Sequence, residues 1–529
     1  MNVRTTEASK VNDVAKTACH EAASVTIIQP QPSTHGKVVK LSVIDQIAPR
    51  DYISLCLFFR LSSDADTRWI FRVLEMALLN TVDDIPELAC CVRKNTSNGR
   101  EEVQLLFDTS KGVEIHYKDY TSSKLRGLWK FGTFDQLEQE HFPLTKMPRH
   151  IVFGTSAKLE ENISLPSLVV QANFIPGGLI LGSCLHVSTR SAFDSFLLFE
   201  LRSGSEHVSG DGICNFLWHK TMGTHFATIA DGLMSKPTSP IPFLERNSVV
   251  EGDQGVTLEE FPNWKLAEDA AGFLNPTDYE ASEISTFEYA TYFISAEKLA
   301  LLKSRISNKV PDVRLSTTDI LGAFLWRHVI LARKIDPQRY PEAKLSITVD
   351  SRGRMENPTV PSNYWGNFAE PNAVAKLPVA SLQKGSSSSS SASDRAWGII
   401  YSEAARRIHG AIAAVNDKAV RRLVGLLNQM PKATTLTWNV NRYPGPDMLI
   451  VCIQAHRFND IHFGREIGYP SATRCTVGDT EGKPDGRCMI LPPRRADGRG
   501  LEIMLQYDSM TLKRLENNIE FKDFFVRRN

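Results

Sequence analysis

This 529-residue chain has no cysteine pairs with metal-binding spacing, no apolar run of membrane-spanning length and no large net charge of either sign. Its nine cysteines are scattered and form no C-x-x-C pair, so the sequence indicates neither a metal site nor a disulfide framework. Buried or free thiols in a reducing compartment are the simpler interpretation. The formal net charge of +1 provides no overall basic surface for phosphate groups, which argues against nucleic acid as a main partner.

No stretch approaches the ~18 apolar residues that a membrane-spanning helix requires. Residues 1–24 carry charges without an apolar core behind them, which predicts that they are not a secretory signal. We therefore expect a cytoplasmic protein with no membrane partner. A chain of 529 residues is too long for one compact core, so two large domains or several smaller ones are expected.

Apolar periodicity predicts strands and helices in alternation. The expected strands cover residues 52–61, 165–175, 177–186, 285–295, 344–354 and 447–456. The expected helices cover residues 68–82, 213–234, 316–335 and 396–415, and residues 501–521 are expected to form a strand followed by a helix. Pro176, Gly177 and Gly178 predict a hairpin between the second and third strands.

Composition then suggests a domain plan. Residues 1–35 are polar and expected to be loose, and residues 236–283 are rich in proline, glycine and acidic residues, which is typical of a long linker. Two α/β domains of similar make are therefore expected, at residues 36–235 and 284–529. The serine-rich stretch 385–394 is predicted to be a flexible surface insertion in the second domain.

A predicted strand-to-helix turn carries the pattern His207-Val-Ser-Gly-Asp211-Gly212. An imidazole with a pKa of about 6.5 can accept a proton from a hydroxyl while the oxygen attacks a carbonyl. An aspartate four residues later cannot easily touch the same ring, so we expect Asp211 to clamp the turn to an arginine elsewhere. Gly212 leaves the backbone free to turn. A surface loop with a solvated histidine and aspartate is the alternative.

Further sequence blocks, in order along the chain, resemble the BAHD-type acyl-CoA-dependent acyltransferases, in particular the fungal trichothecene 3-O-acetyltransferase-like branch. The likeness covers roughly residues 38–525. Besides the histidine motif, the blocks are LSVIDQI at residues 41–47, IPELACCVR at 85–93, STTDILGAFLW at 316–326 and VDSRGRMENPTVPSNYWGN at 349–367. Each block is weak alone, and the order of the set makes the resemblance specific.

The resemblance implies two chloramphenicol acetyltransferase-like α/β domains with mixed sheets, joined by a long crossover linker, with a channel at their interface. It implies that His207 is the general base and that Asp211 is a structural aspartate paired with Arg352 or Arg354. Acyl-CoA, with acetyl-CoA as the first expectation, would be the co-substrate, and no bound cofactor or metal is implied. The expected acceptor is a hydroxyl of a small secondary metabolite of the mycotoxin kind, and the expected protein is a monomer. The residue that would stabilise the oxyanion is not identified by the sequence.

One family signature, Asp-Phe-Gly-Trp-Gly, is altered in this chain. The corresponding stretch, residues 459–468, reads NDIHFGREIG, with His462 in place of the aspartate and Arg465 in place of the tryptophan. In the family this motif shapes the channel, so the departure affects the expected geometry on the CoA side more than catalysis. The simple interpretation of His462 is a polar residue at a strand end.

The tripeptide His-Val-Ser occurs at His186 and again at His207, and only the second copy continues into Asp-Gly. Members of the family often have the motif His-His-x-x-x-Asp-Gly directly after a strand. Removing residues 187–206 would place His186 next to His207 and restore that motif. Since these 20 residues correspond to 60 nucleotides in frame, a retained intron or gene-model error is one hypothesis and an evolved loop is the other. Under either, His207 is the expected base, and an insertion there is expected to impair catalysis.

Two other functions stay open at this stage. The chain could be an impaired homologue that binds acyl-CoA or a metabolite without catalysis, given the insertion and the altered signature. It could also be a condensation-like enzyme that uses a carrier-protein thioester, although the sequence shows no carrier domain.

Overall fold

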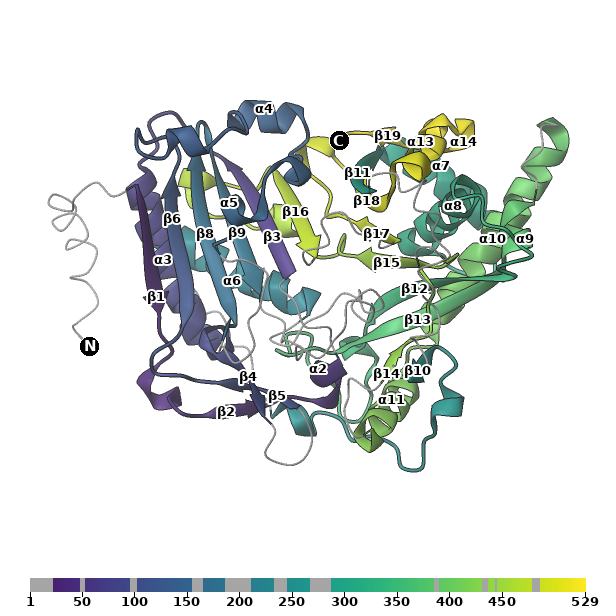
Figure 1. The fold of residues 1–529 in the computed structure, drawn as a ribbon, viewed down its shortest axis with the longest axis horizontal. Coiled ribbons are helices and arrows are strands. Elements are labelled where there is room, and N and C mark those ends of the chain that lie inside the picture. The colour runs from purple at the N-terminus through teal and green to yellow at the C-terminus, as the bar shows by residue number, and fades with distance from the viewer. Residues whose placement is uncertain are drawn as a thin grey trace, which may run out of the picture.

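The computed structural model describes two halves, each built on a mixed β-sheet (Figure 1). The described residues are 22–47, 53–95, 102–154, 165–185, 211–232, 245–266, 287–384, 390–430, 436–442, 445–477 and 486–529. His186, His207 and the rest of residues 186–210 lie outside them, as do residues 236–244 and 267–283 of the predicted linker.

The first half is a six-stranded sheet in the order β1-β6-β8-β9-β3-β16. Its strands are β1 (Ala23–Ile28), β6 (Val113–Asp119), β8 (Leu168–Ile175), β9 (Gly178–Leu185), β3 (Ile53–Arg60) and β16 (Ala472–Val477). The predicted hairpin is confirmed, because β8 and β9 pair antiparallel around Pro176 and Gly177. Gly177 adopts φ +82°, a left-handed conformation that glycine reaches without steric cost.

This sheet is buried on both faces, which explains its continuous apolar strands. Along β3, Leu55 and Leu57 face one core, which also contains residues of helices α3 (Thr67–Asp84) and α6 (Gly212–Asp231). Cys56 and Phe58 face another core, which contains Phe134 of the short helix α4 (Phe134–Gln139). In Figure 1, α3 and α6 lie behind the sheet and α4 lies in front of it near the top.

The second half is a seven-stranded sheet in the order β13-β12-β15-β17-β18-β11-β19. Its strands are β13 (Ala369–Pro378), β12 (Glu342–Asp350), β15 (Met448–Cys452), β17 (Arg487–Ile490), β18 (Leu501–Asp508), β11 (Phe287–Ile294) and β19 (Val526–Arg527). Helix α8 (Thr317–Ala332) is buried nearly all round, next to α10 (Ser390–Ala413), and it begins with a capping box between Ser316 and Asp319. These elements agree with the strands and helices predicted for this part of the chain.

One strand crosses between the halves. β16 comes from the second half of the sequence, yet it pairs antiparallel with β3, so the yellow-green β16 lies beside the purple β3 in Figure 1. Arg474 on β16 also forms a buried ion pair with Glu502 on β18, with Nη1 2.8 Å from Oε2. The domain boundaries drawn from composition stay predictions. A strand from the second predicted domain nevertheless belongs to the sheet of the first half.

Two small sheets lie at the lower side of Figure 1. One joins β2 (Val38–Lys40), β5 (Glu102–Leu106), β4 (Cys91–Asn95) and β7 (Leu165–Pro166). The other pairs β10 (Trp264–Leu266), from the predicted linker, with β14 (Leu436–Trp438).

Two expectations drawn from composition are wrong in part. Residues 23–28, within the segment expected to be loose, form β1, because the sequence ASVTII is rich in β-branched residues and pairs with β6. Helix α10 begins at Ser390, so residues 390–394 of the predicted flexible insertion are helical, because serine is tolerated at the start of a helix that continues into an apolar stretch. Residues 385–389 lie outside the described residues.

Candidate active site

Asp211 caps the N-terminus of helix α6. Its Oδ1 accepts hydrogen bonds from the backbone N–H groups of Ile213 at 3.1 Å and Cys214 at 3.2 Å. Because the first N–H groups of a helix have no partner inside the helix, an aspartate at this position stabilises the start of α6. The carboxylate thereby fixes the chain immediately after the His207 segment.

The second oxygen of Asp211 holds a buried arginine. Arg352 Nη1 lies 2.7 Å from Asp211 Oδ2, and the backbone N–H of Phe368 donates to the same oxygen at 3.1 Å. The Asp211 and Arg352 side chains are only 6% and 1% exposed. Of the two arginines that the sequence left open, Arg352 makes this contact, whereas Arg354 Nη1 donates to the carbonyls of Ile412 and Val415.

Arg352 is itself fixed on every side. It lies directly after β12, where Nη1 also donates to Asp350 Oδ1 at 2.8 Å, and Nη2 donates to the carbonyls of Gly366 at 2.7 Å and Tyr364 at 3.2 Å. Burial alone would lower the pKa of Arg352, but Asp211, Cys214 and Asp350 act together against that effect and raise the pKa. The guanidinium therefore stays charged and orients the start of α6.

Sequence blocks that lie far apart meet around this pair. Asp45, from the LSVIDQI block, accepts hydrogen bonds from the backbone N–H of Asn367 at 2.7 Å and of Ser42 at 2.9 Å. Arg246 lies 3.6 Å from Asp45, and both side chains are fully buried. Burial raises the pKa of Asp45, and the charge of Arg246 opposes that rise. The block at 41–47, the linker and the block at 349–367 thus form one polar network.

The strand before the motif is tied to the helix after it. His219 on α6 lies with Nε2 3.3 Å from the Ser183 hydroxyl oxygen on β9, and its Nδ1 donates to the Asn215 carbonyl at 2.7 Å. Burial lowers the pKa of His219 to about 3, so the ring is neutral. Both flanks of residues 186–210 are therefore held in one core.

Gly212 contacts a histidine that the sequence analysis did not single out. A Cβ at Gly212 would lie 3.3 Å from Nε2 of His456, so glycine leaves room for this ring. The signal in the sequence is weak, since His456 is simply the last residue of a predicted strand. Strand β15 in fact ends at Cys452, and the loop that follows carries His456 to the Asp211 turn.

The altered signature packs against the same helix. Phe463 is fully buried and lies edge-on to Phe59, with ring centroids 5.0 Å apart. Gly464 has φ +70°, and a Cβ there would lie 3.2 Å from the Cα of Ala227 on α6. The expectation that His462 ends a strand is wrong, because this residue lies in the short connection before helix α12 (Gly464–Ile467), with its ring 4.6 Å from that of Tyr469.

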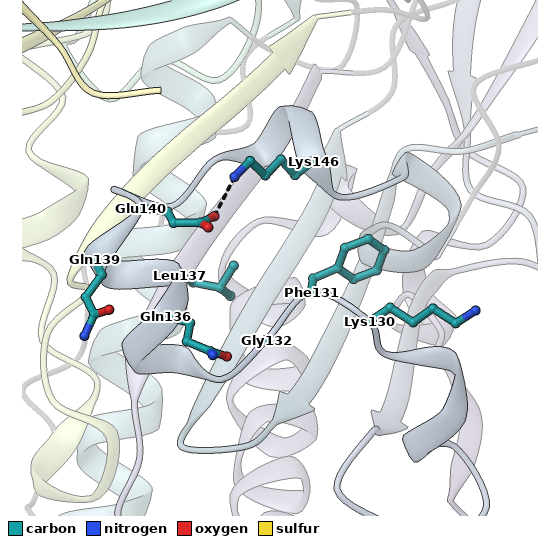
Figure 2. A pocket seen from close by; sticks show the side chains of 8 residues that line it. All are labelled: Lys130, Phe131, Gly132, Gln136, Leu137, Gln139, Glu140 and Lys146. Atoms are coloured by element: carbon teal, nitrogen blue, oxygen red, sulfur yellow. Dashed lines mark hydrogen bonds and ion pairs between the residues drawn. The ribbon is translucent and has the colours of Figure 1, made fainter.

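A surface hollow of about 470 Å³ lies away from this site, around α4. Figure 2 shows its polar rim, where Lys146 Nζ donates to Glu140 Oε2 at 2.9 Å. None of its lining residues belongs to the network of Asp211 and Arg352. The hollow is therefore not part of the candidate site.

Two other features are absent from the part of the chain that the structure describes. No helix among the described residues is sufficiently long and apolar to cross a membrane. No group of three or more His, Cys, Asp or Glu side chains in the same part of the chain could hold a metal ion.

Comparison with known proteins gives consistent matches over nearly the whole chain. Acyltransferase cm3D of Cordyceps militaris is 26% identical over 503 residues, which cover 92% of this chain and 96% of that protein. Acyltransferase easC of Emericella nidulans is 25% identical over 493 residues, which cover 92% and 94%.

Solved structures show the same fold. Apo TRI101 of F. graminearum has a TM-score of 0.72 at 16% identity and covers 93% of this chain and 100% of its own. TRI101 of F. sporotrichioides, solved with coenzyme A and T-2, has a TM-score of 0.72 at 17% identity and the same coverage. The predicted α/β fold class is thus confirmed.

Family models divide the chain between them. The model of the trichothecene 3-O-acetyltransferase-like N-terminal domain matches residues 52–191. The model of the Transferase family matches residues 213–522, more than half of the chain. This chain therefore belongs to the Transferase family, as an acyltransferase of its trichothecene 3-O-acetyltransferase-like branch.

Proposed function

We propose that this protein is an acyl-CoA-dependent O-acyltransferase that transfers an acyl group, first of all acetyl, to a hydroxyl of a small secondary metabolite. The observation that carries the proposal is the buried pair of Asp211 and Arg352, because Asp211 caps α6 and follows His207 by four residues in the sequence. The names of cm3D and easC as acyltransferases support it, as does the TRI101 complex with coenzyme A and T-2.

His207 is the general base in this proposal. Its imidazole removes the proton from the acceptor hydroxyl, and the oxygen forms a bond to the thioester carbonyl carbon, whose π electrons move to the carbonyl oxygen. The tetrahedral intermediate then collapses, the C–S bond breaks, and the coenzyme A thiolate takes the proton from the imidazolium. No acyl-enzyme is formed.

Asp211 and Arg352 act by position. One oxygen of Asp211 accepts hydrogen bonds from two backbone N–H groups of α6, and the other accepts from Arg352 and from the backbone N–H of Phe368. Asp211 therefore has no role as a proton acceptor in this scheme. Because a displacement of about 1 Å can cost ~10²-fold in rate, a rigid start of α6 matters for the base that precedes it.

The test measures release of free thiol from acetyl-CoA by the purified full chain with a panel of alcohols. His207→Ala is expected to lower the rate by about 10²–10⁴-fold, the usual contribution of a general base. His186→Ala is a matched control, because His186 begins the same tripeptide without a following Asp-Gly, and it is expected to retain the parent rate. Full activity of His207→Ala would refute the assignment of the base.

A non-catalytic binder of acyl-CoA is the second candidate function. The altered signature NDIHFGREIG is the observation that favours it, because Arg465 stands where the family has tryptophan. Saturable binding of acetyl-CoA without thiol release for any tested alcohol would support this candidate over the enzyme.

A further inference from the structure

His456 lies against the turn that begins α6. The loop after β15 brings it there, and its backbone N–H donates to the Ile453 carbonyl at 3.0 Å. A Cβ on Gly212 would be 3.3 Å from Nε2, so this edge of the ring faces the motif. His456 is thus a neighbour of the residues that the proposed function uses.

Two phenylalanines hold the ring in one orientation. Phe216 on α6 stacks on it, with centroids 6.0 Å apart and an interplanar angle of 20°. Phe458 meets it edge-on, with centroids 6.3 Å apart and an angle of 86°. An imidazole held in this way loses little rotamer freedom when it binds a ligand.

The ring nitrogens of His456 have no hydrogen-bond partner among the residues that the structure describes. The side chain is only half-buried, so it is accessible to a ligand. By contrast, the fully buried His219 is bonded to Asn215 and Ser183, and His328 lies 3.0 Å from the Tyr401 hydroxyl. Because no described residue occupies the ring nitrogens of His456, the imidazole can make a hydrogen bond to a bound ligand.

The electrostatic surroundings favour a neutral ring. Burial lowers the pKa of His456, Asp211 and Asp350 oppose that shift, and Arg352 adds to it, with a net lowering. A neutral imidazole carries one N–H donor and one acceptor, so at neutral pH this ring can donate a hydrogen bond without being an acid.

We propose that His456 is a second histidine of the transfer site, and that its ring N–H donates a hydrogen bond to the thioester carbonyl oxygen as that oxygen becomes an oxyanion. This inference rests on the proposed function. In the addition step, the acceptor oxygen bonds to the carbonyl carbon and the π electrons move to the carbonyl oxygen, where the N–H of His456 stabilises the charge. In the collapse step, the C=O bond re-forms as the C–S bond breaks, and His456 keeps its proton throughout. A fixed donor of this kind stabilises the transition state more than the ground state.

The experiment compares two replacements in the full chain. His456→Phe keeps an aromatic ring against Phe216 and removes the donor, whereas His456→Gln keeps an N–H donor of similar reach. We expect His456→Phe to lower kcat by about 10²–10³-fold with little change in KM for acetyl-CoA, and His456→Gln to stay within about 10-fold of the parent. The pH profile of kcat should keep its shape in both, because the titrating base is His207. Thermal midpoints show whether either replacement has disturbed the fold.

Three results would overturn the inference. One is parent-like kcat in His456→Phe, and another is equal loss in His456→Gln and His456→Phe with lowered thermal midpoints, which would mark a purely structural role. If His456→Phe does not fold, His456→Leu replaces it under the same criteria. Thiol release by the unmodified chain is measured before the variants are compared. Its absence would refute the proposed function and the inference with it.

Discussion

Replacing Arg352 with methionine tests the ion pair that fixes the start of α6. The change keeps an apolar stem of similar length, but it removes the partner of a carboxylate whose side chain is only 6% exposed. Breaking a buried pair from one side costs about 3–5 kcal/mol of unfolding free energy, because the remaining charge is left uncompensated. The carbonyls of Tyr364 and Gly366 lose their hydrogen bonds from Arg352 as well, so we expect the upper part of that range.

Arg60→Met is the matched control. Arg60 also pairs with two carboxylates, those of Asp135 and Glu138, but its side chain is 51% exposed. An exposed pair contributes about 0–1 kcal/mol, so the two variants should differ by several kcal/mol although each loses one arginine.

Urea unfolding followed by tryptophan fluorescence suits this comparison, because the fully buried Trp218 lies on α6 about two turns after the cap and donates to the Asn215 side chain at 2.9 Å. The variant Asp211→Asn keeps a side-chain oxygen for the cap and loses the charge. Combined with Arg352→Met, it should be destabilised by less than the sum of the two single changes. Equal urea midpoints for Arg352→Met and Arg60→Met would refute the reasoning. So would a double variant of Asp211→Asn and Arg352→Met whose loss of unfolding free energy equals the sum of the two single losses.

Two further predictions concern pH and the insertion. Burial raises the pKa of Glu370 on β13 to about 7, so the carboxyl stabilises the fold below its unfolded pKa of about 4.5, and this contribution is lost as pH rises through 7. Glu370→Gln should therefore gain about 1–3 kcal/mol relative to the parent between pH 5 and pH 8, measured as a thermal midpoint at each pH, and a pH-independent difference would contradict this. Removing residues 187–206 should raise the rate of thiol release and stabilise the fold by about 1 kcal/mol, because it shortens the connection between β9 and α6, which the contact of Ser183 and His219 already holds. A lower thermal midpoint in the shortened chain would show that these residues belong to the fold.

Local features of the fold were predictable from the sequence. The hairpin at Gly177 needs only a turn that tolerates positive φ between two apolar runs. Helix α8 needs only the box of Ser316 and Asp319 before an apolar stretch. Both signals act over a few residues, so one sequence contains them in full.

Contacts between distant segments were not predictable in this way. Arg352 and Arg354 are two residues apart on one turn, and only the packed structure decides which reaches Asp211. The meeting of His456 with Gly212 depends on how two sheets are arranged, and nothing local to either residue encodes it. The pairing of β16 with β3 is of the same kind.

The exchanged strand has a consequence for anyone who wishes to recombine this enzyme with its relatives. β16 leaves the second sheet after β15, supplies the outer strand of the first sheet next to β3, and the chain returns as β17. A fragment made of the first half alone would present the unpaired backbone edge of β3 to solvent, which is a template for aggregation. Chimaeras that join halves of different origin must therefore take residues 472–477 from the donor of β3, with Arg474 matched to the Glu502 of the other parent.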